Sequence, residues 1–347
     1  MKKVLALVLA LVMAMSLFAG CAAKPADTSG TPTATPTAAP KLSFGMITDV
    51  GGLGDKSFND SAWVGIQKGG TEFKVKPVIL QSTKATDYET NIGSMAQQVD
   101  LTVAVGFLME KAMGTASGQY ADKKFGIVDT VVDKPNVMSV VFKEHEGSFL
   151  VGVIAGITTK SNIVGFVGGM EFPLIKKFEY GFKAGVMSVN PKAKILSAYT
   201  GVFDSPDKGK EVALSQFKQK ADVIYHASGA CGIGVIQAAD EKDFWAIGVD
   251  MDQAAQSKKN KVLASMIKRV DVATYTMVKA YADGTFKAGT TILGLKEDGV
   301  GYSDNGKNVK PETVAIVDKY KAAIIDGTIV VPDTEEAYKA FKPTEIK

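Results

Sequence analysis

The strongest constraint on the fold is an alternation, from residue 41 onward, of short β-branched apolar runs with stretches of helical periodicity. The runs fall into two series, at 43–48, 77–80, 101–106, 125–128 and 137–142, and at 163–167, 194–199, 221–226 and 244–249. The helix-like stretches include 58–69, 87–99, 176–189 and 208–217. This spacing predicts βαβ units with parallel strands, and the uninterrupted apolar runs indicate sheets with helices on both faces. We therefore predict an α/β fold of two doubly wound lobes, with an eight-fold (β/α) barrel as the alternative.

The N-terminal residues have the features of a signal peptide. Lys2 and Lys3 precede an apolar run at 4–18, and these 15 residues are too few for a bilayer-spanning helix, which needs about 20. The run ends at Phe18-Ala-Gly-Cys21, which resembles a bacterial lipobox except that phenylalanine stands where leucine is usual. The sequence predicts a signal peptide at 1–20 and lipidation of Cys21, with a plain secretory signal as the alternative.

The segment that follows, at 21–40, is rich in Thr, Pro and Ala and lacks large apolar side chains. Such a composition cannot form a packed core, because it has too little apolar surface to offset the entropy of ordering the chain. We expect a flexible tether that joins the lipid on Cys21 to the folded body and holds the protein at the membrane.

The charge balance and the cysteine content exclude several function classes. The chain carries 40 Lys and Arg against 37 Asp and Glu, so it lacks the basic excess of a nucleic-acid-binding protein. Two His and two Cys argue against a His/Cys metal site, and we expect neither a metal nor a cofactor. With Cys21 lipidated, Cys231 has no partner for an intrachain disulfide and should be a buried structural thiol.

A glycine-rich loop at 49–59 directly follows the first predicted strand. It is neither a Walker A loop nor a dinucleotide fingerprint, because the required glycine and lysine spacings are absent. Asp49 and Asp55 would repel phosphate, so the loop favours a neutral, hydroxyl-rich ligand. Ser57 begins a capping-box pattern for the next helix. Phe58 either presents an aromatic face to that ligand or is an ordinary core residue.

Polar or aromatic side chains also follow other predicted strands. Asp129 and Asp250 end apolar runs, Phe203 follows a turn after another strand, and Lys268 follows the run Ser-Met-Ile. Because ligands of open α/β sheets bind beyond the carboxyl ends of the strands, we interpret these residues as facing a polar ligand. A carboxylate at a strand end can alternatively cap the next helix, but capping explains the whole set less well.

The signal for catalysis is poor. Neither His145 nor His226 has a nucleophile and an orienting acid at a recognisable spacing, and the chain has no G-x-S-x-G motif. We interpret His226 as an interior or rim histidine, and we expect that the protein is not an enzyme.

Five segments together resemble the basic membrane protein (Bmp) family of lipoproteins. They are D-x-G-G-x-G-D-x-S-F-N at 49–59, GSFLVGVIAG at 147–156, FVGGM…FEYGFKAGV at 166–186, YTGVFDSPDKGKE at 199–211 and IGVDMDQ…LASMIKRVD at 247–271. The resemblance covers roughly residues 42–331 in chain order. Better-known members of that family are purine nucleoside receptors, the substrate-binding components of ABC importers.

The resemblance implies a type I periplasmic-binding-protein fold, in which two doubly wound parallel-sheet lobes are joined by three crossing strands and a ligand cleft lies between them. On this basis we expect one lobe to comprise residues 41–142 and 253–286. The other should comprise residues 143–252 and 287–342.

The resemblance also implies residue roles for recognition of the base. Phe58 and Phe203 match the two aromatic residues that sandwich it. Asp129 matches the carboxylate that reads its edge, where accepting from an N–H favours guanosine, inosine or adenosine-like ligands.

The remaining matched positions lie near the ribose. Asp49, Asp250 and Lys268 match residues there, and carboxylates can accept hydrogen bonds from the 2′- and 3′-hydroxyls. Asn59 is a weaker match to the same group of ligand-binding residues.

The function that the resemblance implies is capture of a purine nucleoside outside the cytoplasm by a monomer that is lipid-anchored to the cell membrane. It would then deliver the nucleoside to an ABC permease and its ATPase subunits. Two alternatives remain at this point: a binding lipoprotein of the same fold for another small solute such as a sugar, and a surface adhesin or regulatory lipoprotein.

Overall fold

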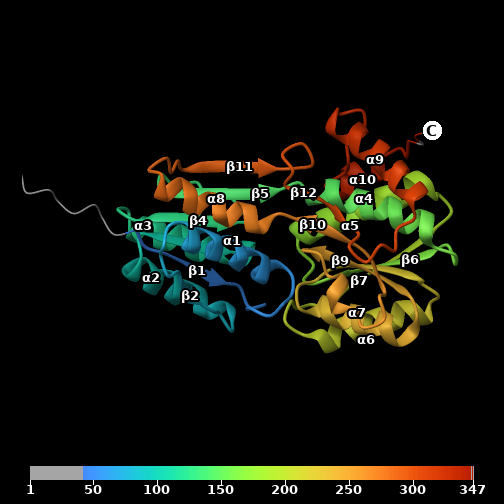
Figure 1. The fold of residues 1–347 in the computed structure, drawn as a ribbon, viewed down its shortest axis with the longest axis horizontal. Coiled ribbons are helices and arrows are strands. Elements are labelled where there is room, and N and C mark those ends of the chain that lie inside the picture. Colours follow the sequence, from blue (N-terminus) through green and yellow to red (C-terminus); the bar gives the residue numbers. More distant parts are fainter. Residues whose placement is uncertain (1–41, 345, 347) are drawn as a thin grey trace, which may run out of the picture. The chain divides into compact units, whose positions relative to one another are not determined.

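Two six-stranded sheets organise the chain (Figure 1). The computed structural model describes residues 42–344 and residue 346. The predicted signal peptide at 1–20, Cys21 and the tether at 21–40 therefore lie outside the described residues. Within the described part of the chain, no helix has both the length and the apolar content needed to cross a membrane.

The first sheet has the strand order β11-β5-β4-β3-β1-β2, and all its neighbouring strands are parallel. Its strands are β1 (Phe44–Thr48), β2 (Val78–Leu80), β3 (Leu101–Val105), β4 (Lys124–Val128), β5 (Val137–Phe142) and β11 (Gly289–Leu293). Its helices are α1 (Phe58–Glu72), α2 (Tyr88–Gln98), α3 (Glu110–Gln119) and α8 (Val270–Ala282). We call this sheet and these helices lobe 1.

The helices of lobe 1 cover both faces of its sheet because alternate strand residues point to opposite sides. Met46 of β1 belongs to a buried cluster with Ile66 of α1, whereas the next residue, Ile47, belongs to a second cluster with Ile92 of α2 and Met113 of α3. The strand β1 is buried throughout. The uninterrupted apolar runs in the sequence are therefore explained by burial on two faces.

The second sheet has the order β12-β10-β9-β8-β6-β7, with β12 antiparallel to β10 and the other pairs parallel. Its strands are β6 (Ile163–Gly168), β7 (Lys194–Tyr199), β8 (Val223–Ala227), β9 (Trp245–Asp250), β10 (Val262–Lys268) and β12 (Val300–Ser303). Its helices are α4 (Glu144–Thr158), α5 (Pro173–Val189), α6 (Pro206–Lys218), α7 (Cys231–Lys242), α9 (Pro311–Ile325) and α10 (Glu335–Ala340). This sheet and these helices form lobe 2.

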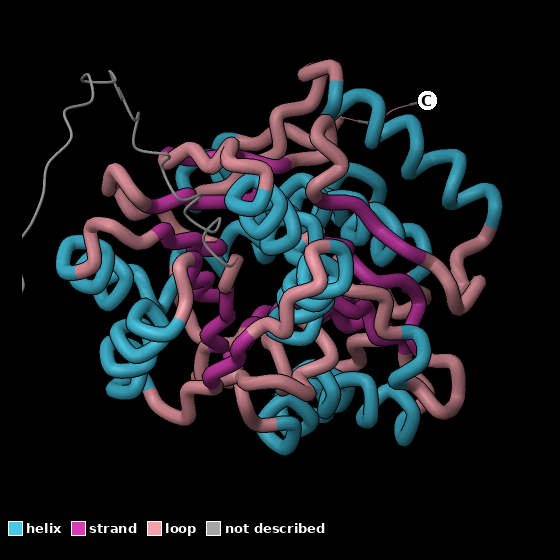
Figure 2. The backbone as a smooth tube through the Cα atoms, turned by 60° about the vertical axis from the view of Figure 1, so that its left-hand side comes forward, coloured by secondary structure: helices cyan, strands magenta, loops and turns pink. Residues whose placement is uncertain are grey.

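Helices also cover both faces of the sheet in lobe 2, with α4 and α5 on one side and α6 and α7 on the other (Figure 1), and the rotated view shows helices on both sides of the strands (Figure 2). Phe166 of β6 packs with Phe182 of α5 on one face, and Val167 belongs to a cluster with Ala213 of α6 and Val235 of α7. Short 3₁₀ helices lie at Ala85–Asp87, Phe107–Met109 and Ala254–Gln256. The two sheets confirm the prediction of two α/β lobes, and the alternative of a single eight-fold barrel is wrong.

The chain passes between the lobes three times: from β5 to α4, from β10 to α8, and from β11 to β12. The crossing segments are hydrogen-bonded to one another, because Arg269 N–H donates to the carbonyl of Gly299.

The expected lobe boundaries need two corrections. Residues 253–268 were expected in the first lobe, but β10 pairs with β9 of lobe 2. Residues 287–293 were expected in the second lobe, but β11 pairs with β5 of lobe 1. The reason is that strand partners, which are remote in sequence, decide membership of a sheet.

Candidate functional site

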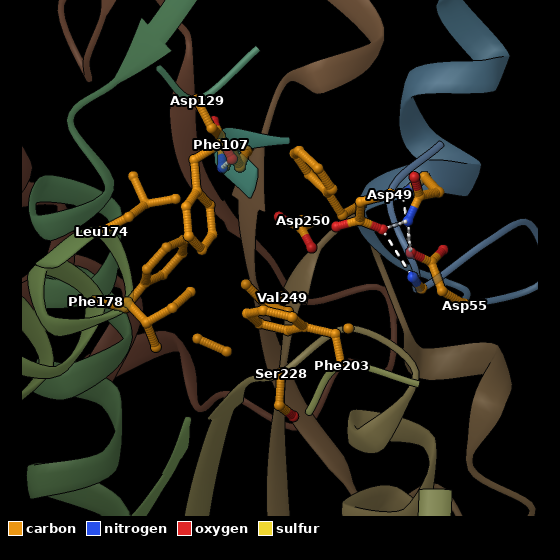
Figure 3. A pocket seen from close by; sticks show the side chains of 17 residues that line it. Asp49, Asp55, Phe107, Asp129, Leu174, Phe178, Phe203, Ser228, Val249 and Asp250 are labelled. Atoms are coloured by element: carbon orange, nitrogen blue, oxygen red, sulfur yellow. Dashed lines mark hydrogen bonds and ion pairs between the residues drawn. The ribbon is translucent and has the colours of Figure 1, made fainter. Parts of the chain in front are cut away.

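A pocket lies where the carboxyl ends of the central strands of both sheets meet (Figure 3). Its empty space is about 510 Å³, a figure that includes space open to solvent. Its lining includes every residue that the sequence predicted for ligand binding: Asp49, Phe58, Asn59, Asp129, Phe203, Asp250 and Lys268. The structure therefore brings the whole predicted set together.

The loop after β1 is held in shape by two carboxylates and one amide. The carboxylate of Asp55 accepts hydrogen bonds from the backbone N–H groups of Ser57, Asn59 and Asp60, so it caps the N-terminus of α1. The side-chain amide of Asn59 donates to Asp49 (2.8 Å) and to Asp55 (3.1 Å). Asn59 therefore orients both acids, and its Oδ1 has no hydrogen-bond partner among the described residues.

The predicted capping box at Ser57 is wrong. The Ser57 side chain makes no cap hydrogen bond, and its hydroxyl instead donates to the carboxylate of Asp250 in lobe 2. The acid three residues later, Asp60, accepts from the N–H groups of Gly54 and Lys56. Ser57 therefore links the two lobes, which a local pattern cannot reveal.

Asp129 and Asp250 occupy equivalent places in the two sheets, at the ends of β4 and β9. Both have a left-handed backbone, with φ of 72° and 65°, which is uncommon outside glycine and is typical of functional sites. In the described chain neither carboxylate caps a helix. One oxygen of Asp129 accepts from Lys268, and one oxygen of Asp250 accepts from Ser57. The alternative of helix capping is therefore not supported for this pair.

Lys268 joins the lobes at the end of β10. Its Nζ lies 2.5 Å from Oδ2 of Asp129, and these side chains are 2% and 4% exposed. The ammonium also lies 4.9 Å from the ring centroid of Phe58, 5.2 Å from that of Phe142 and 5.5 Å from that of Phe178. A buried cation at these distances is stabilised by the carboxylate and by the faces of the rings.

Further residues that the sequence did not predict, most of them apolar, complete the pocket. They include Phe107, Phe178, Leu174 and Ser228. The rings of Phe107 and Phe203 approach edge to face, with centroids 6.4 Å apart. In Figure 3, Asp250 lies centrally, with Phe107 on its left, Asp49 on its right and Phe203 below. The sequence did contain a signal for Phe107. It directly follows the third predicted strand, just as the predicted ligand-binding residues follow other strands.

Burial dominates the electrostatics of the pocket. It raises the pKa of Asp49 and that of Asp250 to about 6, although the Asn59 amide acts against the shift at Asp49 and the charge of Lys268 acts against it at Asp250. Burial alone would lower the pKa of Lys268, but Asp129, Glu144 and Asp250 outweigh it and raise that pKa. The lining is thus rich in hydrogen-bond acceptors and negative in charge, so it disfavours anions.

His226 precedes the pocket residue Ala227 in β8 and is fully buried. Its Nε2 is 2.9 Å from Oε1 of Gln253, which also accepts from the N–H of Val249, and the amide of Gln253 donates to the carbonyl of Lys56 across the lobes. Burial lowers the pKa of His226 to about 4, so the ring is neutral at physiological pH. The interpretation as a satisfied interior histidine is confirmed.

Two further sequence expectations concern cysteine and metal chemistry. Cys231 is a buried free thiol, as predicted. Among residues 42–344 and 346, no group of three or more His, Cys, Asp and Glu side chains is placed to hold a metal ion.

The chain matches the model of the Bmp family, described as ABC transporter substrate-binding protein PnrA-like, over residues 43–335. The protein belongs to the Bmp family. It is therefore an ABC transporter substrate-binding protein, as the resemblance implied, and its family consists of solute-binding proteins.

Relatives and solved structures support this membership. A CD4+ T-cell-stimulating antigen of Listeria monocytogenes is 42% identical, with 83% of this chain and 87% of that protein covered. The ABC transporter nucleoside-binding protein BmpA of Lactococcus lactis is 37% identical, covering 84% and 89%. A solute-binding protein of an Aeropyrum pernix ABC transporter system matches in structure with a TM-score of 0.78 and 28% identity, covering 86% of this chain and 96% of that one.

Proposed function

We propose that this Bmp-family protein is the lipid-anchored receptor of an ABC importer and that it binds purine nucleosides, such as guanosine, inosine or adenosine. The observation that carries the proposal is the meeting of Phe58 and Phe203 with four carboxylates and Lys268 in one buried pocket. Such a lining offers apolar faces to a base and acceptors to N–H and O–H groups, whereas it repels phosphate. The relative from Lactococcus lactis, named as nucleoside-binding, supports the same class of ligand.

The base is held between Phe58 and Phe203 in this proposal. Asp129 reads the base edge, because its Oδ1 has no hydrogen-bond partner within the described residues and is able to accept from a base N–H. Its other oxygen is engaged by Lys268, which fixes the carboxylate in place. Four phenylalanines line the pocket, so a ligand with a planar aromatic ring fits it better than a sugar alone.

The ribose hydroxyls donate to Asp49 and Asp250. Asn59 serves this step indirectly, because its amide orients Asp49. Lys268 lies beside Asp129, so the groups assigned to the base and to the ribose are neighbours. Acceptors in a desolvated pocket discriminate strongly against ligands that leave them unpaired.

Ligand binding favours a closed cleft because the ligand contacts both lobes. Contacts within the protein also join the lobes, among them Ser57 with Asp250, Gln253 with the carbonyl of Lys56, and Lys268 with Asp129. The closed form then presents the nucleoside to an ABC permease and its ATPase subunits. The receptor acts as a monomer, binds no nucleic acid and carries no catalytic step.

The anchor in this proposal is a lipid on Cys21, after removal of residues 1–20, with residues 21–40 as the tether. The protein is then held at the cell membrane and faces outside the cytoplasm. Metabolic labelling with a palmitate analogue tests this: label should enter the wild-type protein, and Cys21→Ala should abolish it. Equal labelling of both proteins would refute the anchor without bearing on the ligand.

The ligand assignment is tested by calorimetry on the purified protein with guanosine, inosine and adenosine, and with nucleotides and sugars as competitors. Nucleosides should bind, whereas 5′-phosphates and sugars should bind much more weakly. Absence of nucleoside binding at millimolar concentration would refute the proposal, and preferential sugar binding would favour the alternative solute. A protein that binds none of these would favour an adhesin or regulatory role.

A further inference from the structure

One buried acid beside the pocket has no role in the function proposed above. Glu144 is the first residue of α4 and is fully buried, yet it is not part of the pocket lining. Within the described residues, neither of its side-chain oxygens accepts a hydrogen bond from another residue. A buried carboxylate without such bonds is costly, so its position needs a reason.

The nearest charges to Glu144 are two ammonium groups. Its Oε1 lies 3.7 Å from Nζ of Lys268, and its Oε2 lies 3.9 Å from Nζ of Lys177. Lys268 therefore stands between two buried carboxylates, with Asp129 at 2.5 Å on one side and Glu144 on the other. Asp129 belongs to lobe 1, whereas Glu144 and Lys268 belong to lobe 2.

Opening the cleft has different consequences for these two contacts. Asp129 moves away with lobe 1. Glu144 and Lys268 stay together because both belong to lobe 2: Glu144 directly follows the crossing from β5 to α4, and Lys268 directly precedes the crossing from β10 to α8. We propose that Glu144 positions Lys268: it is the counter-ion of the lysine while the cleft is open, and it takes up a proton when closure brings Asp129 onto the lysine. This rests on the proposed function, in which a nucleoside drives closure.

The charge balance explains why a proton moves. In the open cleft the buried ammonium of Lys268 faces one buried carboxylate, Glu144, and this pair is neutral. The second ammonium near Glu144 belongs to Lys177, whose side chain is 31% exposed, so water screens its charge. Closure adds Asp129, so two carboxylates would share Lys268 out of contact with water, and like charges at such a site cannot both remain ionised cheaply. The proton comes from solvent and binds a carboxylate oxygen of Glu144, and the ammonium keeps its charge and bonds to Asp129.

The groups that act on Glu144 support this direction. Burial raises its pKa to about 7 in the present contact between the lobes, Asp129 adds to the shift, and Lys268 and Lys177 oppose it. When the cleft opens and Asp129 moves away, the pKa of Glu144 therefore falls. The titratable groups around Glu144 are Lys268 of β10, Lys177 of α5, Asp129 after β4, Tyr225 of β8, and His145 and Glu146 of its own helix.

Isothermal titration of inosine into the purified protein at pH 7, in buffers of different ionisation enthalpy, measures the protons taken up per ligand bound. We expect about half a proton for the wild type, because pH 7 is near the pKa of Glu144 in the contacting lobes. Glu144→Gln should reduce this uptake to near zero. The matched control is Glu146→Gln, which removes another buried carboxylate of the same helix, one that pairs with Lys143, and should leave the uptake unchanged.

A second measurement needs no variant. Infrared difference spectra on adding inosine should show a new protonated-carboxyl band that shifts when glutamate, but not aspartate, carries ¹³C in the side chain. Binding of inosine with no proton uptake in the wild type, with uptake unchanged by Glu144→Gln, or with a band that belongs to aspartate would overturn the inference. A wild-type protein that binds no nucleoside would instead overturn the proposed function.

Discussion

Replacing Lys268 with methionine is the sharpest perturbation of the pocket. Methionine keeps most of the apolar stem that packs against Phe58, Phe142 and Phe178, so the change removes the charge with little change in volume. It leaves Asp129 in a pocket where the side chains of the pair are 2% and 4% exposed. The variant therefore isolates the effect of losing the cation.

The magnitude follows from this burial. Breaking a buried ion pair by removing one partner costs about 3–5 kcal/mol, because the remaining charge stays desolvated. Asp129 and Lys268 lie on different lobes, so an open cleft lets water reach the stranded carboxylate. The cost that arises at Asp129 therefore falls on closure and ligand binding, whereas loss of the counter-ion of Glu144, which lies in the same lobe as Lys268, also lowers the stability to unfolding. At about 1.4 kcal/mol for each tenfold change, nucleoside affinity should fall by roughly 100- to 4000-fold.

Calorimetry with inosine and urea unfolding of the ligand-free protein measure the two effects separately. The double variant Lys268→Met/Asp129→Asn should bind more tightly than Lys268→Met alone. The reason is that relief of the stranded charge, about 3–5 kcal/mol, exceeds the loss of one charged hydrogen bond to the base, about 1.5–3 kcal/mol. Affinity of Lys268→Met within threefold of wild type, with no gain in the double variant, would refute the reasoning, since the pair would then be effectively solvated.

Three further predictions concern packing, stacking and pH. A Cβ on Gly65 would lie 2.0 Å from the carbonyl oxygen of Asp271, so Gly65→Ala should destabilise the protein by about 1–3 kcal/mol or more. Gly114→Ala, in a helix with open space around it, should stabilise it by about 0.5–1 kcal/mol in urea unfolding. Phe203→Ala should weaken nucleoside binding at least about tenfold by calorimetry, because stacking and buried area are both lost. Because burial raises the pKa of Asp49 and Asp250 to about 6, the folded state binds protons before the unfolded state does. With its lobes in the contact seen here, the protein should therefore gain thermal stability from pH 7 to pH 5, and below about pH 6 nucleoside binding should weaken in calorimetry as these acceptors are protonated.

The strands were predictable because a strand that is buried on both faces consists of consecutive apolar residues, and such a run is visible in the sequence. The predicted runs 101–106 and 125–128, for example, contain β3 (Leu101–Val105) and most of β4 (Lys124–Val128). The lobe boundaries were not predictable to the same degree. The strand β10 looks like any other apolar run, and only its pairing with β9, which is non-local, assigns it to lobe 2.

The pocket residues divide in the same way. Asp129 and Asp250 stood out because a carboxylate directly after an apolar strand has few local explanations, and the structure places both in the pocket. Phe178 gave no such signal, because a phenylalanine within an amphipathic helix is normally a core residue. Ser57 carried a misleading one: its capping pattern is local, whereas its hydroxyl bonds to Asp250, 193 positions away.

The placement of Asp129 and Asp250 shows why this fold makes a pocket of this kind. Parallel strands direct all their carboxyl ends to one edge of a sheet, so each lobe presents its loops along a single edge. In each sheet the same strand position ends in a left-handed aspartate, and in each case a group from the other lobe, Lys268 or Ser57, bonds to its carboxylate. The left-handed backbone costs about 1 kcal/mol at each position, and each carboxylate accepts a hydrogen bond from the opposite lobe. Each lobe alone would thus hold an unpaired acid at its edge, and only the meeting of the two lobes provides both the partners and the enclosed space in which a ligand completes the set.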